Sequence, residues 1–324
     1  MASQGKGYRG YVKDFVHFDA KKDADMLRKA MKGLGTDEDT VVKILACRSN
    51  AQRQDISAAF KKAYGRDLVD DLKSELTGKL ENLMVALMKT PVCYDAHELR
   101  NAIKGAGTSE NVLIEILASR TKDEIENIKK TYKKEFSTDL ESAIMGDTSG
   151  HFQRMLVVLL QAARDQNPRA DENLVEKDAR ALFDAGEKKW GTDEDLFINI
   201  LGNRSVAHLR RVFDAYMKIA GFHIEESIER ETTGHMEKVL LAVVKCVRNV
   251  PAYFAECLYK AMKGGGTDDA TLTRIVVSRC EVDMLDIREE FRKNHGQSLY
   301  NMIQNDTSGD YRTALLLLCG GKED

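Results

Sequence analysis

The sequence predicts an all-α protein built from four homologous repeats, and three observations support this fold class. The 324 residues include 3 prolines, and proline is the residue that most strongly interrupts helices. A glycine-rich segment recurs four times together with its surroundings. Within each copy, apolar residues follow the i, i+3, i+4 spacing of an amphipathic helix.

The recurring segment has the form Gly-x-Gly-Thr in its first copy, where Gly33 and Gly35 precede Thr36. The glycine before the threonine repeats at steps of 72, 84 and 75 residues. Thirteen residues after it stands an arginine: Arg48, Arg120, Arg204 and Arg279. Forty residues after it stands an acid: Glu75, Asp147, Glu231 and Asp306. Forty-three residues after it stands another glycine: Gly78, Gly150, Gly234 and Gly309. Agreement of this depth indicates four copies of one structural unit.

Each copy is predicted to consist of helices joined by the glycine segment. Val41, Ile44 and Leu45 make the apolar stripe of the helix that follows the first segment. Thr36, with Asp39 three residues later, is predicted to cap the start of that helix. The expected organisation is an N-terminal tail over 1–14, repeats over 15–87, 88–162, 171–246 and 247–321, and a linker over 163–170 between two halves of the chain.

Composition excludes several functions. The chain has 49 basic and 52 acidic side chains, a net charge of -3, so no basic field is available to hold nucleic acid. No apolar run approaches the roughly 20 residues of a membrane span. The six cysteines are scattered and no secretion signal opens the chain, so we expect a cytoplasmic protein. The seven histidines are scattered too, and no nucleophile–base pair can be proposed, so we expect neither an enzyme nor a small-molecule substrate.

The glycine segment and the distant acid together predict a calcium site. Calcium takes about 6–8 oxygen ligands, from carbonyls, carboxylates and water. Glycine permits backbone angles that aim several carbonyls at one point, and a single bidentate carboxylate adds two oxygens. The predicted ligands in the first copy are Met31, Gly33, Gly35 and Glu75. Those in the second are Ile103, Gly105, Gly107 and Asp147. Those in the fourth are Met262, Gly264, Gly266 and Asp306.

The third copy departs from this pattern because it carries one extra residue. Its ligands are expected to be Gly186, Lys189, Gly191 and Glu231. For a single copy, helix capping alone explains a Gly-x-Gly-Thr turn. Capping does not require a carboxylate forty residues away, however, and this combination occurs four times. An EF-hand and a dinucleotide-binding loop are excluded because their further glycines are missing.

Taken together, the loop, the remote acid, the arginine and the four-fold repetition resemble the annexins, and the resemblance covers about residues 15–321. It implies five helices per repeat in a slightly curved disc, with Ca²⁺ loops that attach the protein to phosphatidylserine-rich membranes. It further implies trimers and two-dimensional arrays on the bilayer, with anticoagulant or phospholipase-A2-inhibitory effects through lipid shielding. Action outside the cell without a signal peptide also fits the resemblance. The family's minor sites imply Thr36 and Glu38 as additional ligands.

The resemblance leaves three points for interpretation. Trp190, the single tryptophan, lies in the third loop, and we predict that calcium turns it outward to contact the membrane. The repeated arginines are predicted to be structural. Channel activity has been proposed for annexins, and a polar path is possible, but we interpret its candidate residues as buried salt bridges between packed helices: Asp95, Glu98, Glu115, Arg120 and Arg274. The competing function is a helical-repeat adaptor for protein partners.

Overall fold

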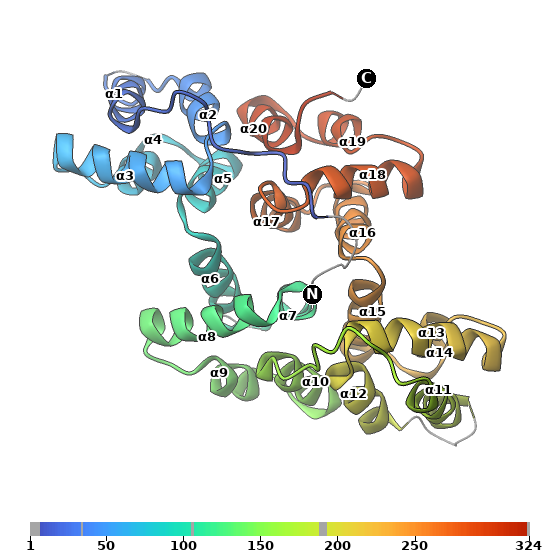
Figure 1. The fold of residues 1–324 in the computed structure, drawn as a ribbon. Helices are drawn as coiled ribbons and strands as arrows, with labels where there is room; N and C mark the ends of the chain where they lie inside the picture. Colours follow the sequence, from blue (N-terminus) through green and yellow to red (C-terminus); the bar gives the residue numbers. More distant parts are fainter. Residues whose placement is uncertain (1–6, 34, 105–106, 188–192, 323–324) are drawn as a thin grey trace. The chain divides into compact units, whose positions relative to one another are not determined.

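The computed structural model describes residues 7–33, 35–104, 107–187 and 193–322, and in this part of the chain every regular element is an α-helix (Figure 1). Each repeat contributes five helices. The first repeat contains α1 (Ala20–Ala30), α2 (Glu38–Ala46), α3 (Asn50–Tyr64), α4 (Leu68–Glu75) and α5 (Gly78–Met88). The second contains α6 (Pro91–Ile103), α7 (Glu110–Ser119), α8 (Lys122–Phe136), α9 (Leu140–Asp147) and α10 (Gly150–Gln161).

The last two repeats have the same order of long and short helices. The third contains α11 (Glu172–Glu187), α12 (Glu194–Asn203), α13 (Val206–Ala220), α14 (Ile224–Glu231) and α15 (Gly234–Arg248). The fourth contains α16 (Val250–Met262), α17 (Asp269–Arg279), α18 (Met284–His295), α19 (Leu299–Asp306) and α20 (Gly309–Cys319). The predicted all-α class with five helices per repeat is therefore confirmed.

The helices form two compact units, and each unit pairs two repeats. One unit comprises Asp95–Val250, which holds the second and third repeats. The other comprises the described residues of Gln4–Tyr94 and Pro251–Asp324, which hold the first and fourth. In both units the second and fifth helices of the two repeats pack together, as α7, α10, α12 and α15 do in one and α2, α5, α17 and α20 in the other. The two units therefore use the same helix–helix interface.

The expectation that the segment after α10 divides the chain into two halves is wrong. This segment is anchored to α12 of the next repeat, within one unit. The backbone N–H of Asp165 donates to the carbonyl of Asn203 at 2.9 Å, and the Arg164 guanidinium donates to the carbonyls of Leu201 and Arg204 at 2.7 Å each. A linker with its polar groups satisfied in this way holds the two repeats together.

The residues that recur in every copy form the cores of the repeats. The aromatic residue twenty-five positions after the loop glycine is fully buried in all four copies, as Phe60, Tyr132, Tyr216 and Phe291. The apolar residue nine positions after it is also buried, as Ile44, Ile116, Ile200 and Ile275. Burial of large side chains is the main stabilising contribution to such packing, about 1.5–3 kcal/mol for each.

In the first three repeats the repeated arginine forms an ion pair with the first helix of its own repeat. Arg120 makes a two-pronged ion pair with Asp95 of α6, with N···O distances of 2.7 and 2.9 Å, and both side chains are buried. Arg48 pairs with Asp23 of α1 in the same way, at 2.7 and 3.0 Å. These contacts are those of structural arginines, as predicted, and they include the Asp95–Arg120 pair from the candidate polar path.

The fourth repeat replaces the acid of this pair. Phe254 occupies the position of Asp95 on the first helix, and the Arg279 guanidinium lies 4.7 Å from the centre of its ring. The ion pair is instead made with Asp283, at 2.7 and 2.8 Å. A cation–π contact and a relocated carboxylate therefore satisfy an arginine that the other repeats pair with their first helix.

The N-terminal tail is docked on the fourth repeat from Arg9 onward. The N–H groups of Tyr11 and Val12 donate to the carbonyl of Cys280 at 2.8 and 3.0 Å, and Arg9 forms an ion pair with Asp286 at 2.9 Å. Gly10 lies directly against the Glu281 backbone, where a β-carbon would be 2.2 Å from the carbonyl oxygen. The tail thus joins the first repeat to the fourth within their unit.

Candidate calcium-binding sites

The glycine loops begin where the first helix of a repeat ends. Met31 is the C-cap of α1, and Ile103 and Met262 are the last residues of α6 and α16. Each loop is closed by a hydrogen bond from a backbone N–H after the loop to the alanine carbonyl before these residues. The four N–H···O pairs are Asp37–Ala30 at 2.9 Å, Ser109–Ala102 at 2.9 Å, Asp193–Ala185 at 3.2 Å and Asp268–Ala261 at 2.7 Å. The two bonded residues are therefore seven positions apart in the first, second and fourth repeats and eight apart in the third.

Four of the loop glycines have backbone angles that favour glycine. Gly33 and Gly264, which are equivalent, have φ values of +121° and +125°. Gly35 and Gly107 have φ values of +84° and +130°. A β-carbon at any of these four positions would meet no heavy atom within 4 Å, so lack of space is not the reason for glycine. Residues with a side chain rarely adopt such φ angles. The glycines therefore let the backbone leave the helical conformation, so that its carbonyls no longer point along the helix axis.

The prediction that Thr36 caps the second helix is wrong. The N-cap is the following residue, Asp37, whose carboxylate accepts from the N–H of Thr40 at 3.0 Å. The Thr36 hydroxyl instead donates to the Glu75 carboxylate at 2.8 Å. The equivalent bonds are 2.5 Å long between Thr108 and Asp147 and between Thr267 and Asp306.

These hydroxyl–carboxylate bonds place the remote acid beside the loop in the first, second and fourth repeats. The acid lies forty residues after the glycine in the sequence, but its carboxylate accepts a hydrogen bond from the threonine that follows this glycine. The carboxylates are half-buried at Glu75 and Asp306 and exposed at Asp147. Each carboxylate keeps unused lone pairs, because a carboxylate offers about four acceptor positions.

The acid has the same place in every repeat, at the last residue of the fourth helix: Glu75, Asp147, Glu231 and Asp306. A negative side chain at this end is unfavourable, because a helix C-terminus carries a partial charge of about -0.5. The loop adds carbonyls from the end of the first helix. Where the loop threonine binds the acid, a carboxylate and a loop that starts at a second helix C-terminus are neighbours, and a cation would stabilise such an environment.

The glycine three residues after the acid has a structural role. It is the first residue of the fifth helix, and its φ lies between +62° and +66° in Gly78, Gly150, Gly234 and Gly309. This left-handed residue lets the chain turn sharply between the fourth and fifth helices. The turn fixes where the fourth helix ends, and hence where the acid lies.

The third repeat is described only in part. Gly186 is a buried residue in the last turn of α11, and a β-carbon there would lie 3.0 Å from the Ser227 hydroxyl and 3.8 Å from Cγ of Glu231. The predicted first ligand and the acid are therefore neighbours. Lys189, Trp190 and Gly191 lie outside the described residues, as does Gly105 of the second loop.

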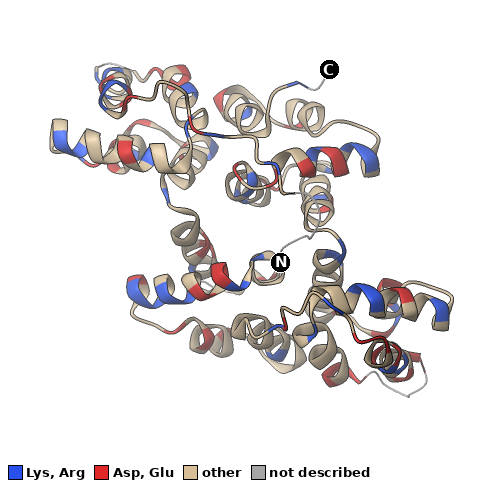
Figure 2. Ribbon diagram, in the orientation of Figure 1, with Lys and Arg blue, Asp and Glu red and all other residues tan. Residues whose placement is uncertain are grey.

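Equivalent residues of the second and third repeats line a cavity of about 440 Å³ within their unit. The six ionisable residues around it are Glu110, Asp147, His151, Glu194, Glu231 and His235. Two of these are predicted calcium ligands. Four acids around one hollow concentrate negative potential between two candidate sites, although the chain as a whole is nearly neutral. Along helices such as α8 and α18, basic and acidic residues are interspersed (Figure 2).

The additional ligands Thr36 and Glu38 lie next to the first site. The Thr36 hydroxyl is engaged by Glu75, and Glu38 is the half-buried first residue of α2. Among the helices that the structure describes, none is long and apolar enough to cross a membrane.

Comparisons with known proteins agree with this arrangement. A family model described as Annexin matches residues 22–87, 94–159, 177–243 and 253–318. The chain is 68% identical to annexin A5 of Gallus gallus, over 98% of both chains, and 64% identical to annexin A5 of Homo sapiens, over 96% of this chain and 98% of the human one. A crystal structure of chicken annexin V in complex with Zn²⁺ matches with a TM-score of 0.95 at 68% identity, over 98% of this chain and 100% of that chain. A calcium-bound annexin, (Sm)1, matches with a TM-score of 0.84 at 33% identity, over 98% and 95%.

Proposed function

The chain belongs to the annexin family of calcium-dependent phospholipid-binding proteins, and we propose that it binds anionic membranes through one calcium site of common design in each repeat. The observation that carries the proposal is the position of the acid. In every repeat a carboxylate stands at a helix C-terminus, and in three of them a threonine of the glycine loop binds it.

The ligand count explains why membrane and calcium bind together. Three carbonyls and a bidentate carboxylate supply about five of the roughly 6–8 oxygens that calcium takes. Water or a lipid phosphate oxygen completes the shell. A site with one charged ligand binds calcium weakly by itself, toward the 10⁻⁴–10⁻³ M end of the range for protein modules. Phosphate therefore strengthens calcium binding, and calcium strengthens phosphate binding by the same factor.

This mechanism also explains how a protein with a negative net charge binds an anionic membrane. A protein of charge -3 is not attracted to phosphatidylserine-rich bilayers by its own field. Bound calcium reverses the charge locally at each loop. We propose that this bridge places the protein on the membrane surface when calcium rises, and in the cytoplasm otherwise.

Replacing the four acids by amides tests the site assignment. The variant Glu75→Gln/Asp147→Asn/Glu231→Gln/Asp306→Asn keeps the shape of the side chains and removes four charges. It should need at least tenfold more calcium for half-maximal pelleting with phosphatidylserine vesicles, since each site loses its only carboxylate. The circular dichroism spectrum should be unchanged.

The matched control removes four exposed carboxylates elsewhere, one per repeat: Asp70→Asn, Asp123→Asn, Glu229→Gln and Asp310→Asn. It has the same net charge as the test variant and should keep the calcium dependence of the parent protein. Equal calcium requirements in the two variants would refute the assignment. If the parent protein failed to pellet with these vesicles at any calcium concentration, a helical-repeat adaptor for protein partners would instead be favoured.

Trp190 reports on the third site. We propose that calcium turns the indole from a shielded position into the headgroup layer, where a ring with an N–H donor is favoured. Calcium alone should shift its emission to the red and increase acrylamide quenching. Adding phosphatidylserine vesicles should then shift the emission back to the blue. A spectrum that responds to neither addition would leave this loop without a membrane role.

Assembly on the bilayer extends the proposal. We propose that membrane-bound copies associate into trimers and arrays, and that an array shields lipid from coagulation factors and phospholipase A2, also where the protein reaches the outside of cells. Cross-linking on phosphatidylserine vesicles with calcium should yield trimers, and cross-linking in calcium without vesicles should yield monomers. Monomers under both conditions would exclude the array.

A further inference from the structure

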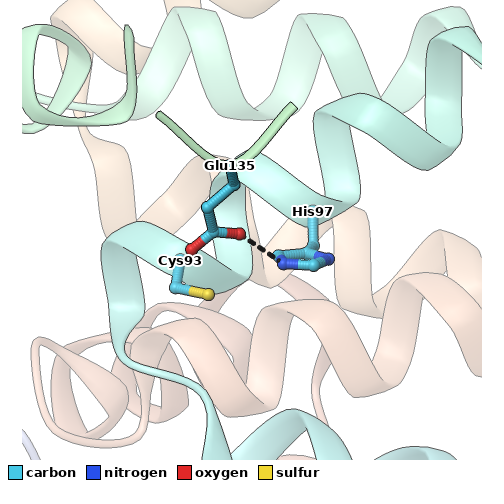
Figure 3. A group of neighbouring side chains, drawn as sticks. All are labelled: Cys93, His97 and Glu135. Atoms are coloured by element: carbon cyan, nitrogen blue, oxygen red, sulfur yellow. Dashed lines mark hydrogen bonds and ion pairs between the residues drawn. The ribbon is translucent and has the colours of Figure 1, made fainter. Parts of the chain in front are cut away.

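The second repeat carries a group of three metal-binding side chains away from its calcium loop. Cys93 and His97 lie one turn apart on α6, and Glu135 lies near the end of α8 (Figure 3). Nε2 of His97 is 2.6 Å from a carboxylate oxygen of Glu135, and one donor atom from each of the three residues lies within 4.8 Å of the others. Cys93 and His97 are half-buried and Glu135 is exposed, so solvent ions reach the group.

The repeated fold does not require these residues. The equivalent positions in the first repeat hold Lys21, Asp25 and Ala63. Those in the fourth repeat hold Ala252, Glu256 and Asn294. The same two helices therefore form and pack without a thiol or an imidazole, and the combination of sulfur, nitrogen and oxygen donors belongs to the second repeat alone among these three.

The donor set selects the class of metal. Calcium prefers oxygen ligands only, whereas thiolate and imidazole together suit zinc. Two residues four apart on one helix present their side chains on the same face, and the third ligand comes from a neighbouring helix. We propose that Cys93, His97 and Glu135 bind one Zn²⁺ ion, with water in the fourth tetrahedral position.

Little movement is needed to close the site. Zinc lies about 2.0–2.3 Å from such ligands, so their donor atoms are about 3.3–3.8 Å apart around a tetrahedral ion. The His97–Glu135 pair opens from 2.6 Å by less than an ångström, and the thiol approaches by a similar amount through side-chain rotation. The imidazole is already oriented, because its ring packs edge-on against Phe136 with centroids 5.1 Å apart.

The ion would fasten α6 to the end of α8. These helices are already joined by Arg100, whose guanidinium lies 5.5 Å from the centre of the Phe136 ring and 3.5 Å from the Tyr132 hydroxyl. A metal that binds only the folded arrangement raises the stability of that arrangement, by an amount that increases with the logarithm of the free metal concentration once this exceeds the dissociation constant. Binding displaces the thiol proton, so affinity falls as pH falls.

Cobalt(II) titration of the full-length protein tests the proposal, with zinc competition to measure affinity. The parent protein should bind one ion per chain, with a near-ultraviolet thiolate–cobalt charge-transfer band and the visible bands of a tetrahedral site. Cys93→Ser should abolish the charge-transfer band. His97→Gln and Glu135→Gln should each weaken zinc binding at least 10–100-fold, the loss seen even for outer-shell partners. Zinc should raise the melting temperature of the parent and not that of Cys93→Ser.

Two controls separate this site from the others. Cys47→Ser removes another half-buried thiol, one whose pKa is raised by burial, and should leave the cobalt spectrum unchanged. The variant that lacks the four calcium-site acids should also keep the spectrum, so failure of the calcium assignment and failure of the zinc site are distinguishable. A thiolate band that persists in Cys93→Ser, or zinc binding lost only with the calcium-site acids, would overturn the proposal.

Discussion

Arg120→Ala should destabilise the protein far more than Arg204→Ala, although the two arginines are equivalent in sequence. Arg120 and Asp95 keep 3% and 8% of their side-chain surface exposed. Burial by itself would lower the pKa of Arg120, but the charge of Asp95 and the hydrogen bonds to it hold this pKa above its usual value. Removing the guanidinium strands a buried carboxylate, which costs about 3–5 kcal/mol.

The Arg204 pair offers the internal comparison. Arg204 is 39% exposed, and its partner Asp178 also contacts His208, whose Nε2 lies 2.9 Å away. Water therefore screens the pair, and Asp178 keeps a partner when the arginine is removed. The expected loss for Arg204→Ala is about 1 kcal/mol, at the upper end for exposed ion pairs. At about 2–4 °C per kcal/mol, the melting temperature should fall by about 6–20 °C for Arg120→Ala and about 2–4 °C for Arg204→Ala.

Thermal unfolding without calcium, followed by circular dichroism, measures the difference, and vesicle pelleting of the folded variants provides the second readout. The double variant Arg120→Leu/Asp95→Leu should recover most of the loss, because it leaves no unpaired charge in the interior. Equal melting temperatures for the two single variants would refute the burial argument. A normal melting temperature with weaker lipid binding for Arg120→Ala would mean that the arginine contacts lipid headgroups.

Three further predictions concern the tail, a histidine and the loop threonine. Gly10→Ala should cost about 1–3 kcal/mol in thermal unfolding, because its β-carbon meets the Glu281 carbonyl, whereas Gly7→Ala, with open space around it, should cost nothing measurable. Burial lowers the pKa of His295, whose ring stacks on Tyr259 with centroids 4.0 Å apart, so near pH 6 the unfolded chain binds a proton that the folded chain does not. The free energy of unfolding should therefore fall as pH falls below about 6.5. The melting temperature of His295→Phe should fall less steeply with pH than that of the parent protein. Thr267→Val removes the hydroxyl that binds Asp306 and should raise the calcium concentration needed for half-maximal vesicle binding by up to about tenfold. The matched control Thr313→Val should leave this calcium concentration unchanged.

Repetition made the helices and the acid positions predictable from the sequence. Because the four copies differ elsewhere, the residues they share mark what the fold requires, and the buried Phe60, Tyr132, Tyr216 and Phe291 follow from this comparison. The capping residue was misassigned because Thr36 and Asp37 are both good N-caps. The Thr36 hydroxyl binds Glu75, a contact between residues far apart in sequence that local capping rules do not consider.

Which repeats pair with each other could not be predicted from the sequence, for a different reason. The apolar faces of the second and fifth helices are alike in all four copies, so the sequence pattern does not indicate which repeat packs against which. Individual contacts join the paired repeats, such as Asn50 and Arg53 with Glu281 in one unit and Arg164 with the end of α12 in the other. The group formed by Cys93, His97 and Glu135 was not predicted from the sequence, since the cysteines are scattered and none pairs with another at metal-binding spacing. Glu135 joins the other two residues only through the packing of α8.

The unfavourable position of the four repeated acids favours calcium binding over a purely structural role for them. Structural acids are expected near helix N-termini, where the helix dipole stabilises them by about 0.3–1 kcal/mol, and this protein follows that rule with Asp37, Asp67 and Asp139 as N-caps. The four repeated acids break it, since each closes the fourth helix at its negative end. In the first and fourth loops, which begin at the C-terminal ends of α1 and α16, Gly33, Gly35 and Gly264 have φ values that other residues rarely adopt. In a single repeat, helix packing alone would explain these features. The same unfavourable charge at the same position in all four repeats is the physical reason for our proposal that a bound cation offsets it.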